Sequence, residues 1–197
     1  PLPITAATEG YPDEVVVHSL CRFLGIEAGT IYNCGGKSNL DKKIHGYNQA
    51  AKSWYWLVLR DLDHDADCAP TLLNHLLPIP EKMMLLRIVV REIESWLLGD
   101  RERFSQFIGV SENSVPSEPE MLADPKGKVI QLAKRSRKRN IRESMTPREG
   151  SGAKVGPAYA SCLAEFADNH WRPEVAALSC DSLKRCLDRM REWTEIA

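Results

Sequence analysis

The chain has no long apolar run, and this absence narrows the classes of protein to which it can belong. Among its 197 residues, no stretch approaches the roughly 18 apolar residues that a membrane-spanning helix needs. Its first residues also turn polar too soon for a secretion signal. We therefore predict no membrane partner. The composition, 43% hydrophobic and 27% charged, suits one domain with a sizeable core, or a domain with a helical extension.

The sequence lacks paired cysteines. None of the six forms a CxxC pair, and their spacings fit no zinc template. We interpret them as free thiols, buried or partly buried, in a reducing cytoplasm. They are Cys21, Cys34, Cys68, Cys162, Cys180 and Cys186.

A strong net charge is also lacking, since the formal charge is −1. The two signs are nevertheless separated along the chain. Residues 126–142 hold eight basic side chains and no acidic one, whereas acidic residues gather at 61–67. A chain with one acidic and one basic segment could bind a polyanion through a metal ion and cationic side chains together.

Apolar runs alternate with helical periodicity in the first half of the chain, which predicts an α/β fold. We expect a mostly parallel four-stranded sheet flanked by helices over residues 1–100, followed by a helical extension over 101–197 that packs on this core. The predicted strands are 2–8, 30–33, 55–60 and 84–90, and the predicted helices between them are 13–24, 40–51, 70–76 and 91–98. The extension is predicted to hold helices at 101–108, 126–139, 159–169 and 182–193, an ordered loop at 111–125 and a mobile segment at 143–156.

Carboxylates follow two of the predicted strands directly. Glu9 comes after the first strand, and Asp61, Asp63 and Asp65 come after the most apolar one. The carboxyl ends of parallel strands meet at one edge of a sheet, where such folds place their sites. Oxygen-rich sites of this kind favour hard cations, so we predict a Mg²⁺ or Mn²⁺ site formed by these four residues.

The acidic loop has two other interpretations. A calcium-binding EF-hand needs glycine at loop position six and glutamate at position twelve, but the chain has no glycine there and has Leu72 at the second position. A solvated surface loop stays open as an alternative. His64 lies inside the loop and could bind metal or move a proton, although an exposed loop histidine needs no role.

The segment 91–100 carries further acidic residues. A helix over 91–98 would place Glu92 and Trp96 on one face and turn Glu94 away by about 200°. We therefore favour Glu92 as a catalytic residue beside Glu9, Asp61 and Asp63 and as a fifth metal-binding carboxylate, with Asp100 as a weaker candidate and Trp96 in the core. The alternative is that these acids only complement the helix dipole.

Phosphate-binding candidates come from two segments. Gly36 and Lys37 could bring backbone N–H groups and a positive charge to a phosphate, although a plain turn is the alternative. The basic segment 126–142 could track a nucleic-acid backbone, or could simply be a solvated face. No aromatic residue lies within it, so base stacking is not indicated. The candidates from this segment are Lys126, Lys134, Arg135 and Lys138.

Glu9 after a first strand, with Asp61 and Asp63 after a later apolar strand, resembles the Toprim domain of topoisomerases, primases and OLD-type nucleases. The chain is more closely similar to the Toprim-like domain-of-unknown-function family 4276 over most of residues 1–130. The segments that carry this likeness are Thr8-Glu9-Gly10 with Asp13-Glu14, Gly35-Gly36-Lys37, Arg60-Asp61-Leu62-Asp63 with Asp65, the block 91–100, and Asp124-Pro125-Lys126. The resemblance implies that Glu9 serves as a general acid/base or metal ligand and that the two aspartates bind Mg²⁺.

These observations together favour a metal-dependent nuclease that hydrolyses phosphodiester bonds with Mg²⁺ or Mn²⁺. The family resemblance further implies a role in prokaryotic antiphage defence. One alternative is a non-catalytic module that holds nucleic acid or a partner ATPase, and another is nucleotidyl transfer. The sequence leaves open whether the substrate is DNA or RNA, and it leaves the oligomeric state open.

Overall fold

The structure, a computed structural model, describes residues 3–195 and is built around a four-stranded parallel sheet. The strand order is β2-β1-β3-β4, and every neighbouring pair is parallel. The strands are β1 (Ile4–Thr8), β2 (Ala28–Asn33), β3 (Trp56–Asp61) and β4 (Met84–Val89). The predicted α/β fold is thus confirmed, and the arrangement is consistent with a Rossmann-like or Toprim-like topology.

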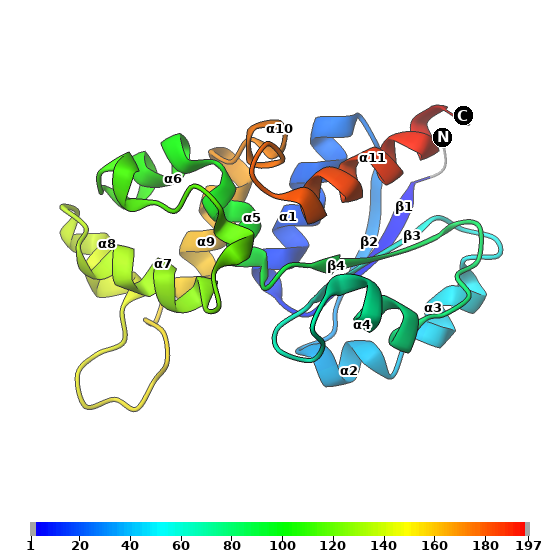
Figure 1. Ribbon diagram of the computed structural model, residues 1–197, viewed down its shortest axis with the longest axis horizontal. Helices are drawn as coiled ribbons and strands as arrows, with labels where there is room; N and C mark the ends of the chain where they lie inside the picture. The colour runs from blue at the N-terminus through cyan, green and yellow to red at the C-terminus, as the bar shows by residue number, and fades with distance from the viewer. Residues whose placement is uncertain (1–2, 196–197) are drawn as a thin grey trace.

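Helices cover both faces of the sheet, as parallel strands require. Figure 1 shows α1 and α11 on one face and α2, α3 and α4 on the other. The bounds are α1 (Tyr11–Leu24), α2 (Lys37–Asp41), α3 (Ile44–Ala50), α4 (Ala69–Leu76) and α11 (Asp181–Glu195). Each face has its own cluster of buried side chains, and the central strands β1 and β3 contribute to both.

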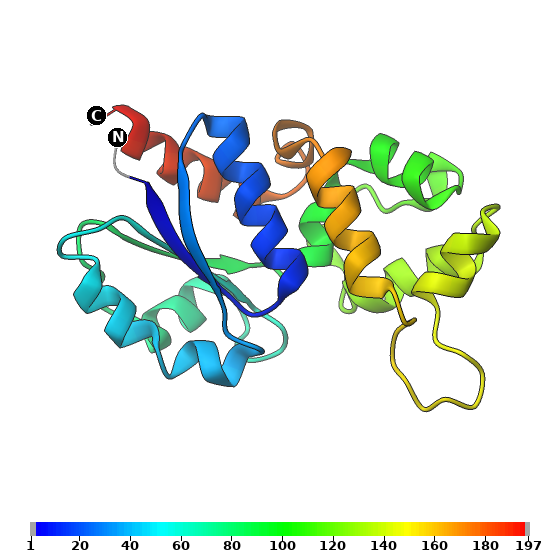
Figure 2. The same cartoon turned by 180° about the vertical axis from the view of Figure 1, so that it is seen from behind.

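The rest of the chain forms a helical region beside the carboxyl edge of the sheet. In Figure 2, α9 lies along α1 and ties this region to the core. The cluster of buried side chains on the α1 face continues into it without a break, through Trp96, Phe104 and Phe166. The bounds are α5 (Ile93–Gly99), α6 (Arg101–Ile108), η1 (Glu112–Ser114), η2 (Pro119–Met121), α7 (Pro125–Lys134), α8 (Arg139–Met145), α9 (Tyr159–Asn169) and α10 (Pro173–Ala176). The division at residue 100 stays a prediction.

The basic helix predicted over 126–139 is wrong in its length. Helix α7 ends at Lys134, and a second helix, α8, begins at Arg139. Between them Ser136 is buried, where its hydroxyl donates to the carbonyl of Ile108 and accepts the Lys138 N–H at 2.9 Å. A tertiary contact with the end of α6 therefore bends the chain, and no helical periodicity reveals it.

Other observed helix boundaries also differ from the predicted ones. The helix predicted over 40–51 is two helices, α2 and α3, and the predicted mobile segment 143–156 begins within α8, which runs to Met145. Of the first predicted strand, 2–8, Leu2 lies outside the described residues. No helix within residues 3–195 is long and apolar enough to cross a membrane.

Candidate metal and phosphate site

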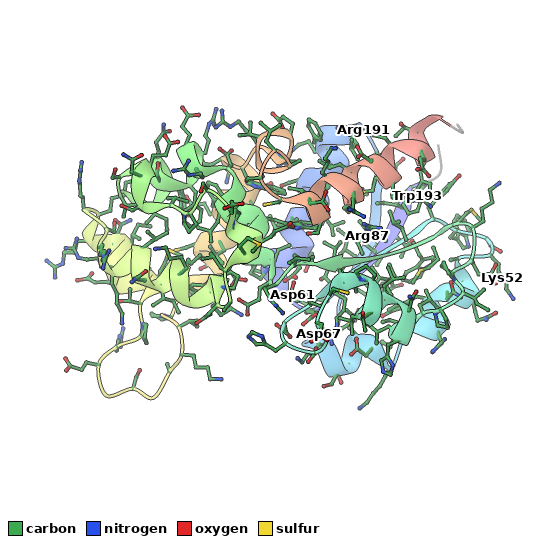
Figure 3. All side chains as sticks on the ribbon, viewed as in Figure 1. Lys52, Asp61, Asp67, Arg87, Arg191 and Trp193 are labelled. Carbon is green, nitrogen blue, oxygen red and sulfur yellow. The ribbon has the colours of Figure 1, made fainter. Side chains whose placement is uncertain are left out.

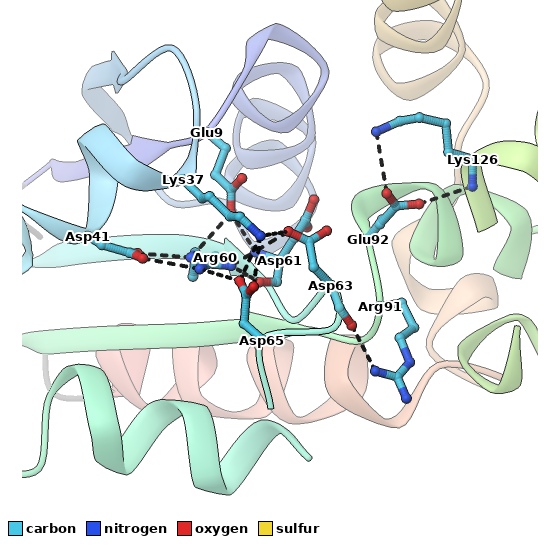
Figure 4. Close-up of polar contacts among 10 residues, drawn as sticks. All are labelled: Glu9, Lys37, Asp41, Arg60, Asp61, Asp63, Asp65, Arg91, Glu92 and Lys126. Carbon is cyan, nitrogen blue, oxygen red and sulfur yellow. Dashed lines mark hydrogen bonds and ion pairs between the residues drawn. The ribbon is translucent and has the colours of Figure 1, made fainter. Parts of the chain in front are cut away.

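Several charged residues of the chain's first half lie at the carboxyl edge of the sheet. Glu9 follows β1, Asp61 is the last residue of β3, and Arg91 follows β4 (Figure 4). Hydrogen bonds join these strand ends. The backbone N–H of Asp61 donates to Glu9 Oε1 at 2.9 Å, and the N–H of Asp63 donates to the carbonyl of Arg91 at 2.8 Å. The edge is therefore a structured surface that holds side chains in fixed positions.

Asp61 occupies the most unusual environment of this edge. Its Oδ1 is buried and has no hydrogen-bond partner among the described residues. Burial, reinforced by the nearby carboxylates of Asp13, Glu9 and Glu94, raises the pKa of Asp61 well above its usual range. A buried carboxylate oxygen without a donor is costly unless something positive is bound to it.

Three further carboxylates surround Asp61, and together the four form what we call the acidic cluster: Glu9, Asp13, Asp61 and Glu94. Burial raises the pKa of Glu9, although the N–H of Asp61 and the charge of Arg60 oppose this. Burial and the charge of Glu94 raise the pKa of Asp13 to about 7. Burial also raises the pKa of Glu94, whose side chain accepts a hydrogen bond from the Tyr159 hydroxyl at 3.0 Å.

Asp13 and Glu94 were not among the predicted site residues. Asp13 begins the helix predicted over 13–24, but it is only 6% exposed and lies in the first turn of α1 beside the cluster. Glu94 was expected to turn away. That expectation assumed a helix that includes Glu92, whereas Glu92 has extended backbone (φ −141°) and α5 begins at Ile93. The signals in the sequence are that both acids lie in the first turn of a predicted helix and within segments that carry the family resemblance.

Glu92 faces Lys126 at the start of α7. Glu92 Oε2 accepts the backbone N–H of Lys126 at 3.1 Å, and Oε1 lies 3.4 Å from Lys126 Nζ. The same Nζ is 3.8 Å from Glu94 Oε1. Burial alone would lower the pKa of Lys126, but Glu94, Glu92 and Asp61 outweigh it and raise the pKa. Lys126 thus stays charged and is the cation nearest the acidic cluster on this side.

Asp63 and Asp65 are held by a second basic group. Lys37 Nζ lies 2.8 Å from Asp63 Oδ2 and 2.9 Å from Asp65 Oδ1, and Arg60 NH2 lies 2.7 Å from Asp65 Oδ2 (Figure 4). Hydrogen bonds from Lys37 and Arg60 lower the pKa of Asp65 despite its partial burial. Asp63 has a left-handed backbone (φ 46°), which is uncommon for aspartate. The turn therefore points two carboxylates at Lys37.

The arginine beneath this turn acts as an internal counterion. Arg60 is 2% exposed and pairs with Asp41 at 2.9 Å as well as with Asp65. It also lies 3.6 Å from Glu9 Oε1. One buried guanidinium therefore supports both groups of carboxylates.

The other predicted phosphate-binding residues lie in different surroundings. The backbone N–H of Gly36 is already bonded to the carbonyl of Glu9 at 2.8 Å, so it is not available to a ligand in this conformation. Lys138 Nζ donates to two carbonyls at the end of α6, those of Gln106 and Phe107, at 2.9 Å each. Its role in this conformation is to cap that helix.

Lys134, Arg135 and His64 are exposed. Asp100, the weaker candidate, is fully buried in a salt bridge with Arg172 at 2.7 Å, which is a structural role.

These contacts determine how well a divalent cation fits the edge. The acidic cluster offers only oxygen donors, as Mg²⁺ and Mn²⁺ prefer, and Asp61 Oδ1 lacks a partner. As placed, however, no three acidic, histidine or cysteine side chains among residues 3–195 converge closely enough to enclose an ion. The donor chemistry therefore fits a cation at Asp61 with Glu9 and Asp13, while Asp63 could join only if Lys37 released it.

Comparisons of the chain with protein-family models, with curated proteins and with solved structures find no match.

Proposed function

We propose that the chain is a Mg²⁺- or Mn²⁺-dependent phosphodiesterase, most simply a nuclease, whose site is the acidic cluster at the carboxyl edge of the sheet. The observation that supports this most is the buried, unpartnered Oδ1 of Asp61 among three other carboxylates. Such an arrangement is unfavourable for stability alone, and it becomes favourable when cations bind. The bound metal would stabilise charge on the attacking and leaving oxygens of the phosphodiester.

Glu9 is suited to move a proton. Its Oε1 is engaged by the N–H of Asp61, which leaves Oε2 to accept the proton of an attacking water. Burial raises its pKa above the ordinary value, and a raised pKa makes a carboxylate a stronger base. The expected contribution of such a base is about 10²–10⁴ in rate.

Two lysines are suited to hold the scissile phosphate. Lys126 approaches the acidic cluster from α7, and Lys37, the first residue of α2, pairs with Asp63, two residues after Asp61. Both have their pKa raised by neighbouring carboxylates, so both carry full charge at neutral pH. When cations neutralise those carboxylates, the ammonium groups can turn to phosphate oxygens.

The test uses purified protein with Mg²⁺ or Mn²⁺ and labelled single-stranded DNA, duplex DNA and RNA. Glu9→Gln and Asp61→Asn should each lower cleavage at least about 10²-fold while substrate binding persists. The matched control is Asp67→Asn, because Asp67 belongs to the same acidic loop but is exposed (Figure 3). Intact substrates under all conditions, or an equal loss in Asp67→Asn, would contradict the proposal.

A non-catalytic nucleic-acid-binding module is the second candidate, and one observation favours it. Lys37 and Lys126 already neutralise Asp63, Asp65 and Glu92 in this conformation. Binding without cleavage, unaffected by chelation of metal, would support this candidate. A partner ATPase, an antiphage role and a reducing cytoplasmic location are proposals that rest on the resemblance and on the free thiols.

A further inference from the structure

Three aromatic rings from three separate elements stack on one face of the sheet. Tyr47 of α3 lies 4.5 Å from Trp56 of β3, with 19° between the ring planes. Tyr32 of β2 lies 5.9 Å from Trp56 at 8° and 6.4 Å from Tyr47 at 21°. Trp56 is 8% exposed but Tyr32 is 48% exposed. The stack therefore runs from the core to the surface, and Tyr32 is its outermost ring.

Tyr32 lies on an open edge of the sheet. Strand β2 is the first of the order β2-β1-β3-β4, so within the described sheet no strand pairs with its outer side. Thr30 and Asn33 of the same strand are also exposed. The Tyr32 ring lies nearly parallel to the rings of Trp56 and Tyr47, and about half of the residue remains accessible. A large aromatic residue fixed in this way is a ready surface for another flat ring.

We call the three stacked rings of Tyr32, Tyr47 and Trp56 the platform, and it adjoins the proposed catalytic site. Tyr32 pairs in register with Ala7, two residues before Glu9. From the spacing of strands and of residues within them, the Cα atoms of Tyr32 and Glu9 are roughly 8 Å apart. Lys37 follows five residues later and reaches Asp63. A chain of nucleotides with a phosphate at the acidic cluster would thus have a base within reach of Tyr32.

We propose that Tyr32 stacks on a base of a single-stranded nucleic acid, and that this selects single strands as the substrate class. This inference rests on the proposed function. In a duplex the bases already stack on one another and their faces are inaccessible, whereas each base of a single strand offers a free face. Stacking would supply the sequence-tolerant contact that the basic segment, which has no aromatic residue, lacks.

The experiment measures binding of a short fluorescein-labelled oligothymidine by fluorescence anisotropy, with EDTA present so that nothing is cut. Tyr32→Leu keeps an apolar side chain against Trp56 but removes the aromatic face. Tyr32→Phe keeps the face. Trp54→Leu is the matched control, because Trp54 is 51% exposed but precedes the amino end of β3, at the end of the strands opposite to Glu9 and Asp61. Thermal unfolding of each variant verifies that it is folded.

We expect Tyr32→Leu to weaken oligothymidine binding by roughly 5-fold to 150-fold, which is the range for one base stacked on an aromatic ring. Tyr32→Phe and Trp54→Leu should bind within about twofold of the parent chain, and duplex affinity should not depend on Tyr32. Equal losses in Tyr32→Leu and Trp54→Leu, or no loss in Tyr32→Leu, would overturn the inference. So would a dimer that Tyr32→Leu dissociates, because a second copy would then cover this edge.

The two proposals can fail separately. Binding that depends on Tyr32, in a protein that cuts nothing with Mg²⁺ or Mn²⁺, would support the platform and contradict the nuclease. Cleavage that Asp61→Asn abolishes, with single-strand affinity and KM unchanged in Tyr32→Leu, would support the nuclease and overturn the platform.

Discussion

Replacing Asp13 by asparagine removes a charge that the folded protein accommodates poorly, and we expect the metal-free protein to become more stable. Burial and Glu94 raise the pKa of Asp13 to about 7, from an ordinary value near 4. Because the pKa of Asp13 is higher in the folded than in the unfolded state, protonation of Asp13 stabilises the folded protein. This stabilisation is complete below about pH 4 and is lost as the pH rises through 7. A shift of this size corresponds to about 3–4 kcal/mol of unfolding free energy at about pH 8.

The assay is chemical unfolding of Asp13→Asn and the parent chain in EDTA, at several pH values between about 4 and 8. The gain should be small at the acidic end and should grow toward about 3–4 kcal/mol at the alkaline end. Glu9, Asp61 and Glu94 also have raised pKa values, so the parent chain as a whole should lose stability over the same range.

The matched control is Glu14→Gln. Glu14 lies in the same first turn of α1 but is only partly buried, so its charge should complement the helix dipole and its loss should cost about 0.3–1 kcal/mol. If Asp13→Asn is destabilising, or if its effect does not change with pH, the claim that the acidic cluster is strained without cations is refuted.

Three further changes test other parts of the account. Lys37→Met should free Asp63 and tighten Mn²⁺ binding several-fold, seen by calorimetry, while slowing turnover; unchanged affinity would mean that Asp63 is not a ligand. Arg172→Met should leave the buried Asp100 unpaired and cost about 3–5 kcal/mol in unfolding free energy without altering metal affinity, and a loss below about 1 kcal/mol would contradict the structural role. Arg87 has a buried Nε without a partner among the described residues (Figure 3). Arg87→Met should therefore raise the unfolding free energy by about 1 kcal/mol. If chemical unfolding instead shows that the unfolding free energy falls by about 1 kcal/mol, the charge of Arg87 is compensated in the folded protein.

The strands and their order of appearance could be predicted because apolar runs of strand length are local signals. The run 55–60 is one example, and it corresponds to β3 with a one-residue offset. Two residues of the acidic cluster, Glu9 and Asp61, followed from the rule that parallel strands end at one edge. The structure brings these two into direct hydrogen-bond contact.

The rest depended on contacts that no local pattern contains. Glu94 faces the cluster because α5 starts at Ile93, and the side chain of Glu92 accepts the backbone N–H of Lys126, from a helix far along the chain. The stack at Tyr32 combines residues of β2, α3 and β3, so the sequence of no single segment predicts it. Long-range contacts of this kind decide which side chains meet.

The central claim is that the acidic cluster binds a divalent cation. Anomalous diffraction from crystals soaked in Mn²⁺ tests it most directly, because it locates the ion and identifies its ligands. We predict a peak at the Asp61 carboxylate, with Glu9 or Asp13 among the other ligands, and its loss in Asp61→Asn crystals. A fully ordered site without any peak at Asp61, or Mn²⁺ bound only elsewhere, would contradict the account.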